Sequence, residues 1–297
     1  MAGSKTPIYT AFAANIAIAI IKFIAASITG SSAMASEGIH SLVDTSNEIL
    51  LLVGLRNSQK KPDEKRPFGY GKELYFWSFV VSLLFFALGG GLSIYEGYQH
   101  LLHPEEIKNP IWNYIVLVLA FLFDGYSLLT AVREFNRQRG NIPFWRAVRV
   151  SKDPSTFVVL FEDVADVLGI LFAATGITLS LVLKNPYIDG IASIMIGLLL
   201  TTVAILLVRE SRSLLMGETL TPAELRDVVQ LLESDKVIDR VYQPLSMYQG
   251  PDEVILLIRL KFKDDIVSQA VAKKIQDLRQ LLQKQYPQYK HIYFEPV

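Results

Sequence analysis

The run Y-I-D-G-I-A-S-I-M-I-G-L-L-L-T-T-V-A-I-L-L-V, Tyr187–Val208, decides the class of fold. It is almost entirely apolar over about 20 residues, the length that an α-helix needs to cross the hydrocarbon core of a bilayer. Such runs are too long and too continuous for the strands of a membrane barrel. The sequence therefore predicts a domain of six transmembrane helices over residues 1–210. The five preceding runs are Ile8–Ile28, Ser32–Leu55, Leu74–Tyr98, Ile111–Val132 and Thr156–Leu183.

The composition agrees with a multi-pass membrane protein. Of the 297 residues, 51% are hydrophobic, and the mean hydropathy is +0.32, which is too apolar for an ordinary soluble protein. The formal net charge is zero, so charge gives no reason to expect a nucleic-acid partner. The chain contains no cysteine, which excludes disulfides and thiolate metal sites.

Basic residues concentrate in two loops, one after the second run and one after the fourth. In the other loops between the runs, the only Lys or Arg residues are Lys108 and Lys184. Because cytoplasmic loops carry an excess of Lys and Arg, this alternation predicts that both basic loops and both termini are cytoplasmic. A partner-binding role for the basic loops explains the regular alternation less well. The basic residues are Arg56, Lys60, Lys61, Lys65, Arg66, Lys72, Arg133, Arg137, Arg139, Arg146, Arg149 and Lys152.

Residues 211–297 have no spanning run and predict a small cytoplasmic domain. Thr221-Pro-Ala-Glu224 has the pattern of a capping box with proline at the first helical position, so a helix is expected over 221–232. The later patterns indicate strands at 237–247 and 253–262, a helix at 268–286 and a short strand at 291–294. The order αββαβ is that of a ferredoxin-like α+β domain. A short interfacial helix is expected within Asn141–Lys152.

The second run contains the polar stretch E-G-I-H-S-L-V-D-T-S-N-E, Glu37–Glu48. On a helix, His40 and Asp44 are four residues apart and share a face, and Glu37 and Asn47 fall on the same stripe. A charged side chain at membrane depth costs about 2.5–3.5 kcal/mol on the insertion scale, so such groups usually have a function.

The fifth run contains a second polar group on one helix face. Glu162 and Asp166 are four residues apart, and Asp163 and Asp166 are three apart. Either pair could meet His40 and Asp44 where the two helices contact, which would place one imidazole and three carboxylates around a point. These ligands suit a tetrahedral zinc site and also Mn, Co or Fe.

Imidazole and carboxylate ligands bind either a metal ion or protons, so a site of this kind can exchange one for the other. The alternative is that the charged groups are buried polar contacts between helices. That alternative stays open for Lys22, Asp124 and Asp189 taken singly, because lone charges inside membranes often pair with one another.

Three motifs resemble those of the cation diffusion facilitator family of metal/proton antiporters. They are S-E-G-I-H-S-L-V-D at Ser36–Asp44, L-F-E-D-V-A-D-V-L-G at Leu160–Gly169, and the glycine motif R-P-F-G-Y-G-K-E at Arg66–Glu73. The resemblance covers nearly the whole chain and is strongest to the mitochondrial zinc-transporter branch and its bacterial relatives. It implies metal ligands at His40, Asp44, Glu162 and Asp166. Asp163, Asn47 and Glu37 are then second-layer groups or alternative ligands.

The chain departs from the family pattern in ways that concern metal choice. The family motif has His where Glu162 stands here, and one imidazole with three carboxylates is a harder ligand set. Zinc is the first expectation, with Mn, Co, Fe and Cd as alternatives. Arg66 and Tyr70 stand where the glycine motif often has His, so the accessory site of the family is not expected. The C-terminal domain has one histidine, His291, close to Glu295, and no metal-sensing cluster is expected there.

The resemblance implies a secondary transporter, not an enzyme, that exports a divalent metal from the cytoplasm in exchange for protons. It also implies a homodimer, which the small size of the C-terminal domain favours independently. The expected location is a prokaryotic plasma membrane, because no transit segment is evident near the N-terminus. Two other classes remain: an intramembrane metalloenzyme, for which no H-E-x-x-H pair or nucleophile is found, and a non-transporting scaffold.

Overall fold

The computed structural model describes residues 6–263 and 268–297. The chain folds into two compact units. The first comprises Met1–Val53 and Trp77–Ser211, and the second comprises Gly54–Phe76 and Arg212–Val297. The second unit thus includes the loop between the second and third predicted spans. The expected division into a membrane domain (1–210) and a cytoplasmic domain (211–297) stays a prediction.

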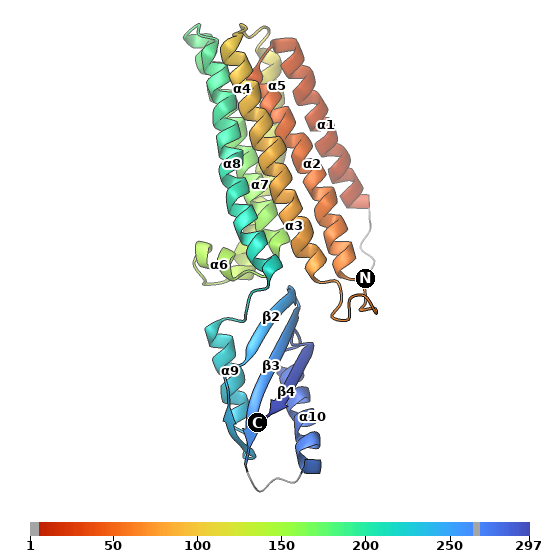
Figure 1. Cartoon of the computed structure of the whole chain (residues 1–297). Helices are drawn as coiled ribbons and strands as arrows, with labels where there is room; N and C mark the ends of the chain where they lie inside the picture. The colour runs from red at the N-terminus through yellow and green to blue at the C-terminus, as the bar shows by residue number, and fades with distance from the viewer. Residues whose placement is uncertain (1–5, 264–267) are drawn as a thin grey trace. The chain divides into compact units, whose positions relative to one another are not determined.

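The first unit is a helical bundle, and a helix occupies each range in which a span was expected (Figure 1). The predicted short helix near Trp145 is also present. The helices are α1 (Thr6–Thr29), α2 (Ser32–Ser58), α3 (Lys72–Leu84), α4 (Gly91–Leu102), α5 (Ile111–Arg139), α6 (Phe144–Val150), α7 (Pro154–Val182) and α8 (Tyr187–Met216).

The third predicted helix contains a break in its hydrogen-bond register. A π-helical segment, η1 (Phe85–Gly90), joins α3 to α4. Segments of this kind occur mostly as single turns inside α-helices and are frequent at functional sites. The sequence pattern predicted an uninterrupted helix here, because a π turn adds only one residue to the apolar repeat.

Helices α4 and α8 approach each other through glycines on both sides. A methyl group at Gly97 would lie 2.6 Å from the Gly190 carbonyl oxygen, and one at Gly197 would lie 2.8 Å from the Ile94 backbone nitrogen. Only a hydrogen side chain fits these positions, so the two backbones pack closely, as small-residue interfaces do in membranes.

Within the described residues, three helical segments are long and apolar enough to cross a membrane: Lys72–Leu102, Ile111–Arg137 and Tyr187–Met216. The stretch Asn15–Thr29 is a shorter apolar helix. The outer surface of the bundle carries many exposed apolar side chains, including Leu122, Tyr126 and Val182, which are 62%, 69% and 71% exposed. Such a surface is suited to lipid contact.

The second unit is an α+β domain in the order α9 (Pro222–Glu233), β1 (Ile238–Val241), β2 (Leu245–Gly250), β3 (Glu253–Phe262), α10 (Ser268–Gln285) and β4 (His291–Pro296). Strand β3 pairs antiparallel with β1 and β2 and parallel with β4. Leu256 is opposite both Ser246 and Ile292, so β2 and β4 lie on opposite edges of β3. The parallel pair needs a crossover, which α10 provides.

The prediction of one strand over 237–247 was wrong, because two strands occupy this range and extend to Gly250. Pro244 lies in the break between them. Proline has no backbone N–H to donate to a ladder, so it interrupts pairing in the sheet. The observed order is therefore αβββαβ, with one strand more than the αββαβ that was expected.

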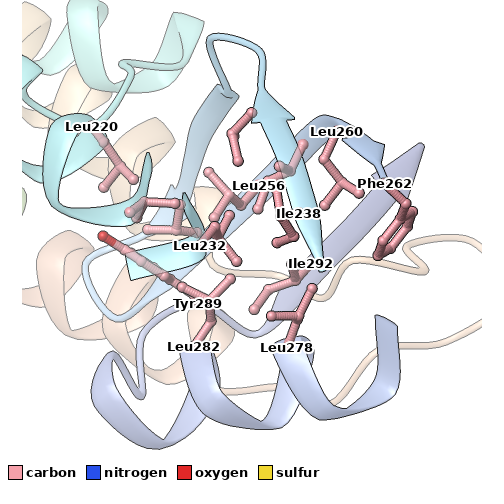
Figure 2. Packing of buried hydrophobic residues seen from close by; sticks show 14 of the residues in the cluster. Leu220, Leu232, Ile238, Leu256, Leu260, Phe262, Leu278, Leu282, Tyr289 and Ile292 are labelled. Atoms are coloured by element: carbon pink, nitrogen blue, oxygen red, sulfur yellow. The ribbon is translucent and has the colours of Figure 1, made fainter. Parts of the chain in front are cut away.

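An apolar core lies between the sheet and the two helices of this unit. Figure 2 shows Leu232 of α9, Leu256 and Leu260 of β3 and Leu278 of α10 directed into it. The N-terminus of α9 has the predicted capping box: Thr221 Oγ1 accepts a hydrogen bond from the Glu224 backbone nitrogen, and Glu224 Oε2 accepts one from the Thr221 backbone nitrogen at 2.7 Å.

The glycine motif after α2 packs on this sheet. A side chain at Gly71 would collide with the backbone of Gln249, and the Phe68 ring contacts His291 edge to face, with centroids 5.3 Å apart. Glycine at 71 is therefore required by the close approach of the two backbones. Before this contact, Asp63 closes a turn by accepting hydrogen bonds from the Arg66 backbone nitrogen (2.8 Å) and the Tyr70 hydroxyl (2.6 Å).

Candidate metal centre

Three of the four predicted ligands meet where α2 contacts α7. His40 Nε2 lies 3.3 Å from Asp44 Oδ2 and 3.2 Å from Asp166 Oδ1. One atom from each of the three residues can be chosen so that all lie within 4.8 Å of one another. His40 and Asp44 share a face of α2 because they are one helical turn apart. The helix contact brings Asp166 of α7 to the same point.

The two distances from His40 Nε2 are those between neighbouring ligands of one metal ion. With metal–ligand bonds of about 2.0–2.1 Å in a tetrahedron, neighbouring ligand atoms are separated by about 3.3–3.4 Å. Within the described part of the chain, neither His40 nitrogen and neither Asp44 oxygen makes a hydrogen bond. Buried polar atoms in this state are costly, and a shared cation or bound protons would satisfy them.

Glu162, the fourth predicted ligand, lines one cavity together with Asp44 and Asp166 and is hydrogen-bonded to a residue of α2. Asn47 Nδ2 donates a hydrogen bond to Glu162 Oε1 at 2.7 Å, and both side chains are buried. Glu162 is not among the three residues whose atoms form the compact group. Asn47 is one of the residues that the sequence placed on the His40 stripe, and its contact with α7 accounts for its position.

Asp163, the alternative ligand, makes a different contact. Ser127 Oγ of α5 lies 3.1 Å from each oxygen of the Asp163 carboxylate, so α5 and not α2 provides its partner. The cavity between these helices has a volume of about 480 Å³. It is lined on the polar side by Asn15, Ser41, Asp44, Glu48, Asp124, Ser127, Glu162, Asp163 and Asp166.

A buried ion pair lies directly behind His40. Lys22 Nζ of α1 donates hydrogen bonds to Glu37 Oε2 at 2.9 Å and to Ser41 Oγ at 2.7 Å, and both Lys22 and Glu37 are fully buried. Glu37 Oε1 and His40 Nδ1 have no hydrogen-bond partner among residues 6–263 and 268–297. Both atoms face Gly169 of α7, where a methyl group would collide with Glu37 Oε1 and lie 3.7 Å from His40 Nδ1.

The π-helical segment contributes to the same site. The Phe85 ring contacts the His40 imidazole edge to face, with centroids 5.5 Å apart and an angle of 75° between the ring planes. Phe85 is fully buried. The altered register of η1 therefore coincides with an apolar side chain that holds the imidazole in place.

Asp189 of α8 accepts hydrogen bonds from the start of α2. Its Oδ2 accepts a hydrogen bond from the Ser32 backbone nitrogen at 2.6 Å, and its Oδ1 accepts one from Ser31 Oγ at 2.8 Å. A carboxylate at this position caps the N-terminus of α2, where backbone N–H groups are free and the helix dipole is positive. Asp189 and Lys22 thus make buried polar contacts between helices, which was the alternative left open for them.

The ion pair between Lys22 and Glu37, next to His40, was not predicted from the sequence spacing. The signal was present, because a lysine in an apolar run needs a buried anion. The choice of partner among several carboxylates depends on helix rotation and could not be read from spacing. The same holds for Phe85, since nothing in its apolar neighbourhood marks it.

Comparison with known proteins agrees with this geometry. The model of the cation efflux transmembrane domain matches residues 8–216. The chain belongs to the cation efflux family. The resemblance to cation diffusion facilitators is thereby confirmed. The match contains α2, α7 and all four predicted ligands.

Individual relatives match over most of this chain. The mouse protein named proton-coupled zinc antiporter SLC30A9, mitochondrial, is 35% identical over 89% of this chain and 47% of its own length. Metal tolerance protein C4 of Arabidopsis thaliana is 31% identical over 91% of this chain and 60% of its own length. Magnetosome protein MamB of Magnetospira sp. (strain QH-2) is 23% identical over 91% and 89%. The chain thus spans about half the length of the SLC30A9 protein.

Proposed function

We propose that this chain is a secondary transporter that exports a divalent transition metal, zinc first, from the cytoplasm in exchange for protons. The observation that carries the proposal is the convergence of His40, Asp44 and Asp166: His40 Nε2 lies 3.3 Å and 3.2 Å from the two carboxylates, as neighbouring ligands of one ion do. The names of the SLC30A9 relatives support both zinc and proton coupling. Membership of a cation efflux family confirms the prediction that the chain is not an enzyme.

Coupling follows from the chemistry of the ligands. The metal binds deprotonated carboxylates and a neutral imidazole, so its arrival displaces protons and its departure lets protons bind. The buried Asp44 and Asp166 carboxylates are unfavourable together without a cation or a proton. A site that is always filled by one or the other, and is exposed to each side in turn, exchanges metal for protons.

Glu162 is our proposed fourth ligand. It shares a helix face with Asp166, and the hydrogen bond from Asn47 fixes its carboxylate beside α2. Asp163 is bonded to Ser127 and would act by electrostatics from the next layer. We further propose that, when metal binds, the His40 Nδ1–H group donates a hydrogen bond to Glu37 Oε1, which leaves Nε2 free for the metal. Metal-binding histidines usually donate their second nitrogen to a carboxylate in this way.

Six membrane spans are part of the proposal: α1, α2, the α3–η1–α4 segment, α5, α7 and α8. Helices α2 and α7 are not among the three segments that meet the length and composition of a span, and both contain the charged residues of the site. The alternation of basic loops supports cytoplasmic termini. Residues 1–5, at the N-terminus, lie outside the described residues. A prokaryotic plasma membrane remains our proposed location, with a mitochondrial membrane as the alternative that the SLC30A9 names suggest.

A homodimer is supported by the open face of the C-terminal sheet. Leu245, Leu257 and Tyr293 are opposite one another across β2, β3 and β4 and are 69%, 47% and 48% exposed. An apolar row across three strands is unusual on a free surface and suits contact with a second copy.

The test is metal flux into proteoliposomes with an imposed pH gradient, using Zn, Mn, Co, Fe and Cd in turn. Flux that depends on the gradient and is lost in Asp166→Ala, but retained in the control His291→Ala, is the expected result. A preference for Mn or Fe over zinc would mean that the three carboxylates decide selectivity. No flux of any metal by the wild-type chain would contradict the proposal and favour the scaffold.

A further inference from the structure

A second cavity lies where the α1–α2 turn meets the end of α4, well away from the carboxylates of the first site. It has a volume of about 370 Å³. Ser32, on its wall, is about 12 Å along α2 from His40, at 1.5 Å per residue. By the alternation of loop charge, this end of the bundle faces away from the cytoplasm.

The end of α4 supplies ligand-type side chains to this cavity. Glu96, Gln99 and His100 share a face of α4 at positions i, i+3 and i+4, and His103, the residue directly after the helix, also lines the cavity. The loop after α4 adds Glu105, whose Oε2 would lie 3.3 Å from a methyl group at Gly30. The chain has only four histidines, and two of them are here.

His100 gives a second, separate indication that this cavity binds a ligand. The residue is 8% exposed, and its Nε2 makes no hydrogen bond within the described part of the chain. The nearest carboxylate oxygen, Asp189 Oδ2, is 3.9 Å away and already accepts hydrogen bonds from Ser32. The His100 imidazole thus has a charged neighbour but no hydrogen bond at Nε2, and a metal ion in the cavity would provide the missing contact.

A ladder of polar groups connects this cavity to His40. Ser32 of α2 is bonded to Asp189 of α8, and one turn further Ser36 Oγ is 2.5 Å from Ser193 Oγ. The next turn of α2 is His40 itself. All of these side chains are buried, so the seam between α2 and α8 is polar from the cavity wall to the first site. Hydroxyl groups on such a seam can replace part of the water around a moving ion.

We propose that His100, His103 and Glu105, with Glu96 beside them, form an exit site that receives the divalent metal after it leaves His40, Asp44 and Asp166. Two imidazoles and a carboxylate are a ligand set suited to zinc. Their ligand atoms do not form a group within 4.8 Å in this structure, so the side chains would turn toward the ion when it binds. The inference rests on the proposed function and adds a second metal position to it. The open mouth of the cavity and the exposure of His103 fit a site from which the ion leaves.

The first experiment removes the transport site and counts what remains. In Asp44→Asn/Asp166→Asn protein in nanodiscs, equilibrium dialysis against zinc alone should show one retained zinc per chain. Adding His103→Ala should remove it, while adding the control His291→Ala should not. His103 is exposed, so its replacement does not endanger folding. Zinc retained after His100→Ala/His103→Ala, or no zinc bound before it, would overturn the exit site.

A second experiment uses the natural lack of cysteine. In His103→Cys, zinc should protect the thiol from a membrane-impermeant maleimide, and adding His100→Ala should abolish that protection. Leu102→Cys is the matched control, because Leu102 is exposed and does not line the cavity. Equal protection at both positions would overturn the proposal. Wild-type flux with no retained zinc would contradict this inference alone, whereas no wild-type flux would contradict the proposed function.

Discussion

The α2–α7 centre and the core of the C-terminal sheet are both buried, but they are built from opposite materials. The C-terminal core is made of side chains such as Leu256, Leu260 and Leu282, which need only be excluded from water. The α2–α7 centre buries Lys22, Glu37 and other polar groups completely and leaves several of their atoms without a hydrogen bond among the described residues. The first arrangement stabilises a fold, whereas the second costs stability.

The two regions therefore differ in what they contribute to stability. A buried ion pair often stabilises less than apolar side chains of the same volume, so stability alone does not explain Lys22 and Glu37. Apolar cores are sensitive to volume, and polar centres are sensitive to charge and hydrogen bonding. Substitutions in the two regions should therefore affect different measurements, and this contrast can be tested.

The largest effect is expected from Asp44→Asn. Loss of one of the three clustered carboxylate and imidazole ligands should lower zinc affinity at this site by about 100-fold or more and reduce flux to background. Thermal unfolding should occur at the same temperature or higher, because one uncompensated buried charge is gone. Zinc dialysis and thermal unfolding on the same protein test both parts. A lower unfolding temperature with normal affinity would reverse the comparison and make Asp44 a structural residue.

The next effect is expected from Leu256→Ala in the C-terminal core. Leu256 is fully buried in β3, and truncating a core leucine costs about 2–5 kcal/mol of unfolding free energy. Hydrogen exchange in β3 and β4 should rise accordingly, while zinc affinity at the α2–α7 site should be unchanged. The adjacent Leu257→Ala is the control, since Leu257 is 47% exposed and should lose much less. Equal losses in the two variants would show that this core does not hold the domain together.

A smaller effect is expected from Lys22→Met. The substitution leaves Glu37 buried without its cation, so Glu37 should no longer hold His40, and zinc affinity should fall by about 10–100-fold. In the double variant Lys22→Met/Glu37→Gln, the loss should be smaller than the sum of the single losses, because the two groups act together. Zinc dialysis of the wild type, the two single variants and the double variant gives the four affinities of this double-mutant cycle. Strictly additive losses would mean that Lys22 does not act through Glu37.

Much of the fold was accessible from the sequence. Apolar runs gave helices at the predicted ranges, since a span needs a fixed length, and Thr221 and Glu224 marked the start of α9 through local hydrogen bonds. The split between β1 and β2 was missed, although Pro244 was the signal for it. The π-helical segment Phe85–Gly90 left no mark, because its register change moves apolar residues onto apolar neighbours.

The proximity of His40, Asp44 and Asp166 was predictable from the sequence, but their contacts with neighbouring residues were not, and their role as metal ligands stays a prediction. His40, Asp44 and Asp166 were found because helical spacing puts polar groups on one face. Glu162 stays a predicted ligand, and its contact with Asn47 was not expected. Lys22 pairs with Glu37, and Asp163 is hydrogen-bonded to Ser127 of α5. Both contacts depend on how α1 and α5 are rotated about their axes, and no local sequence pattern encodes that rotation.

The smallest effect is expected outside both regions, in the turn that precedes the glycine motif. The hydrogen bond from the Tyr70 hydroxyl holds the pKa of the Asp63 carboxyl below its usual value, with the Arg66 backbone nitrogen acting in the same direction. A lowered pKa stabilises this turn above the pH at which a free aspartate titrates, near 4, and the contribution is lost as pH falls through the lowered value. Tyr70→Phe should therefore raise the Asp63 pKa toward its ordinary value.

Carbon-13 carboxyl NMR, with Asp63→Asn to assign the signal, measures this shift directly. Both side chains are at the surface, so the change should leave zinc affinity and the unfolding of β3 unaffected. An unchanged Asp63 pKa in Tyr70→Phe would mean that the backbone donor alone sets it. A change in zinc affinity would be the more informative failure, since it would show that this turn acts on the α2–α7 centre and that the contrast between buried polar groups and the rest of the molecule is incomplete.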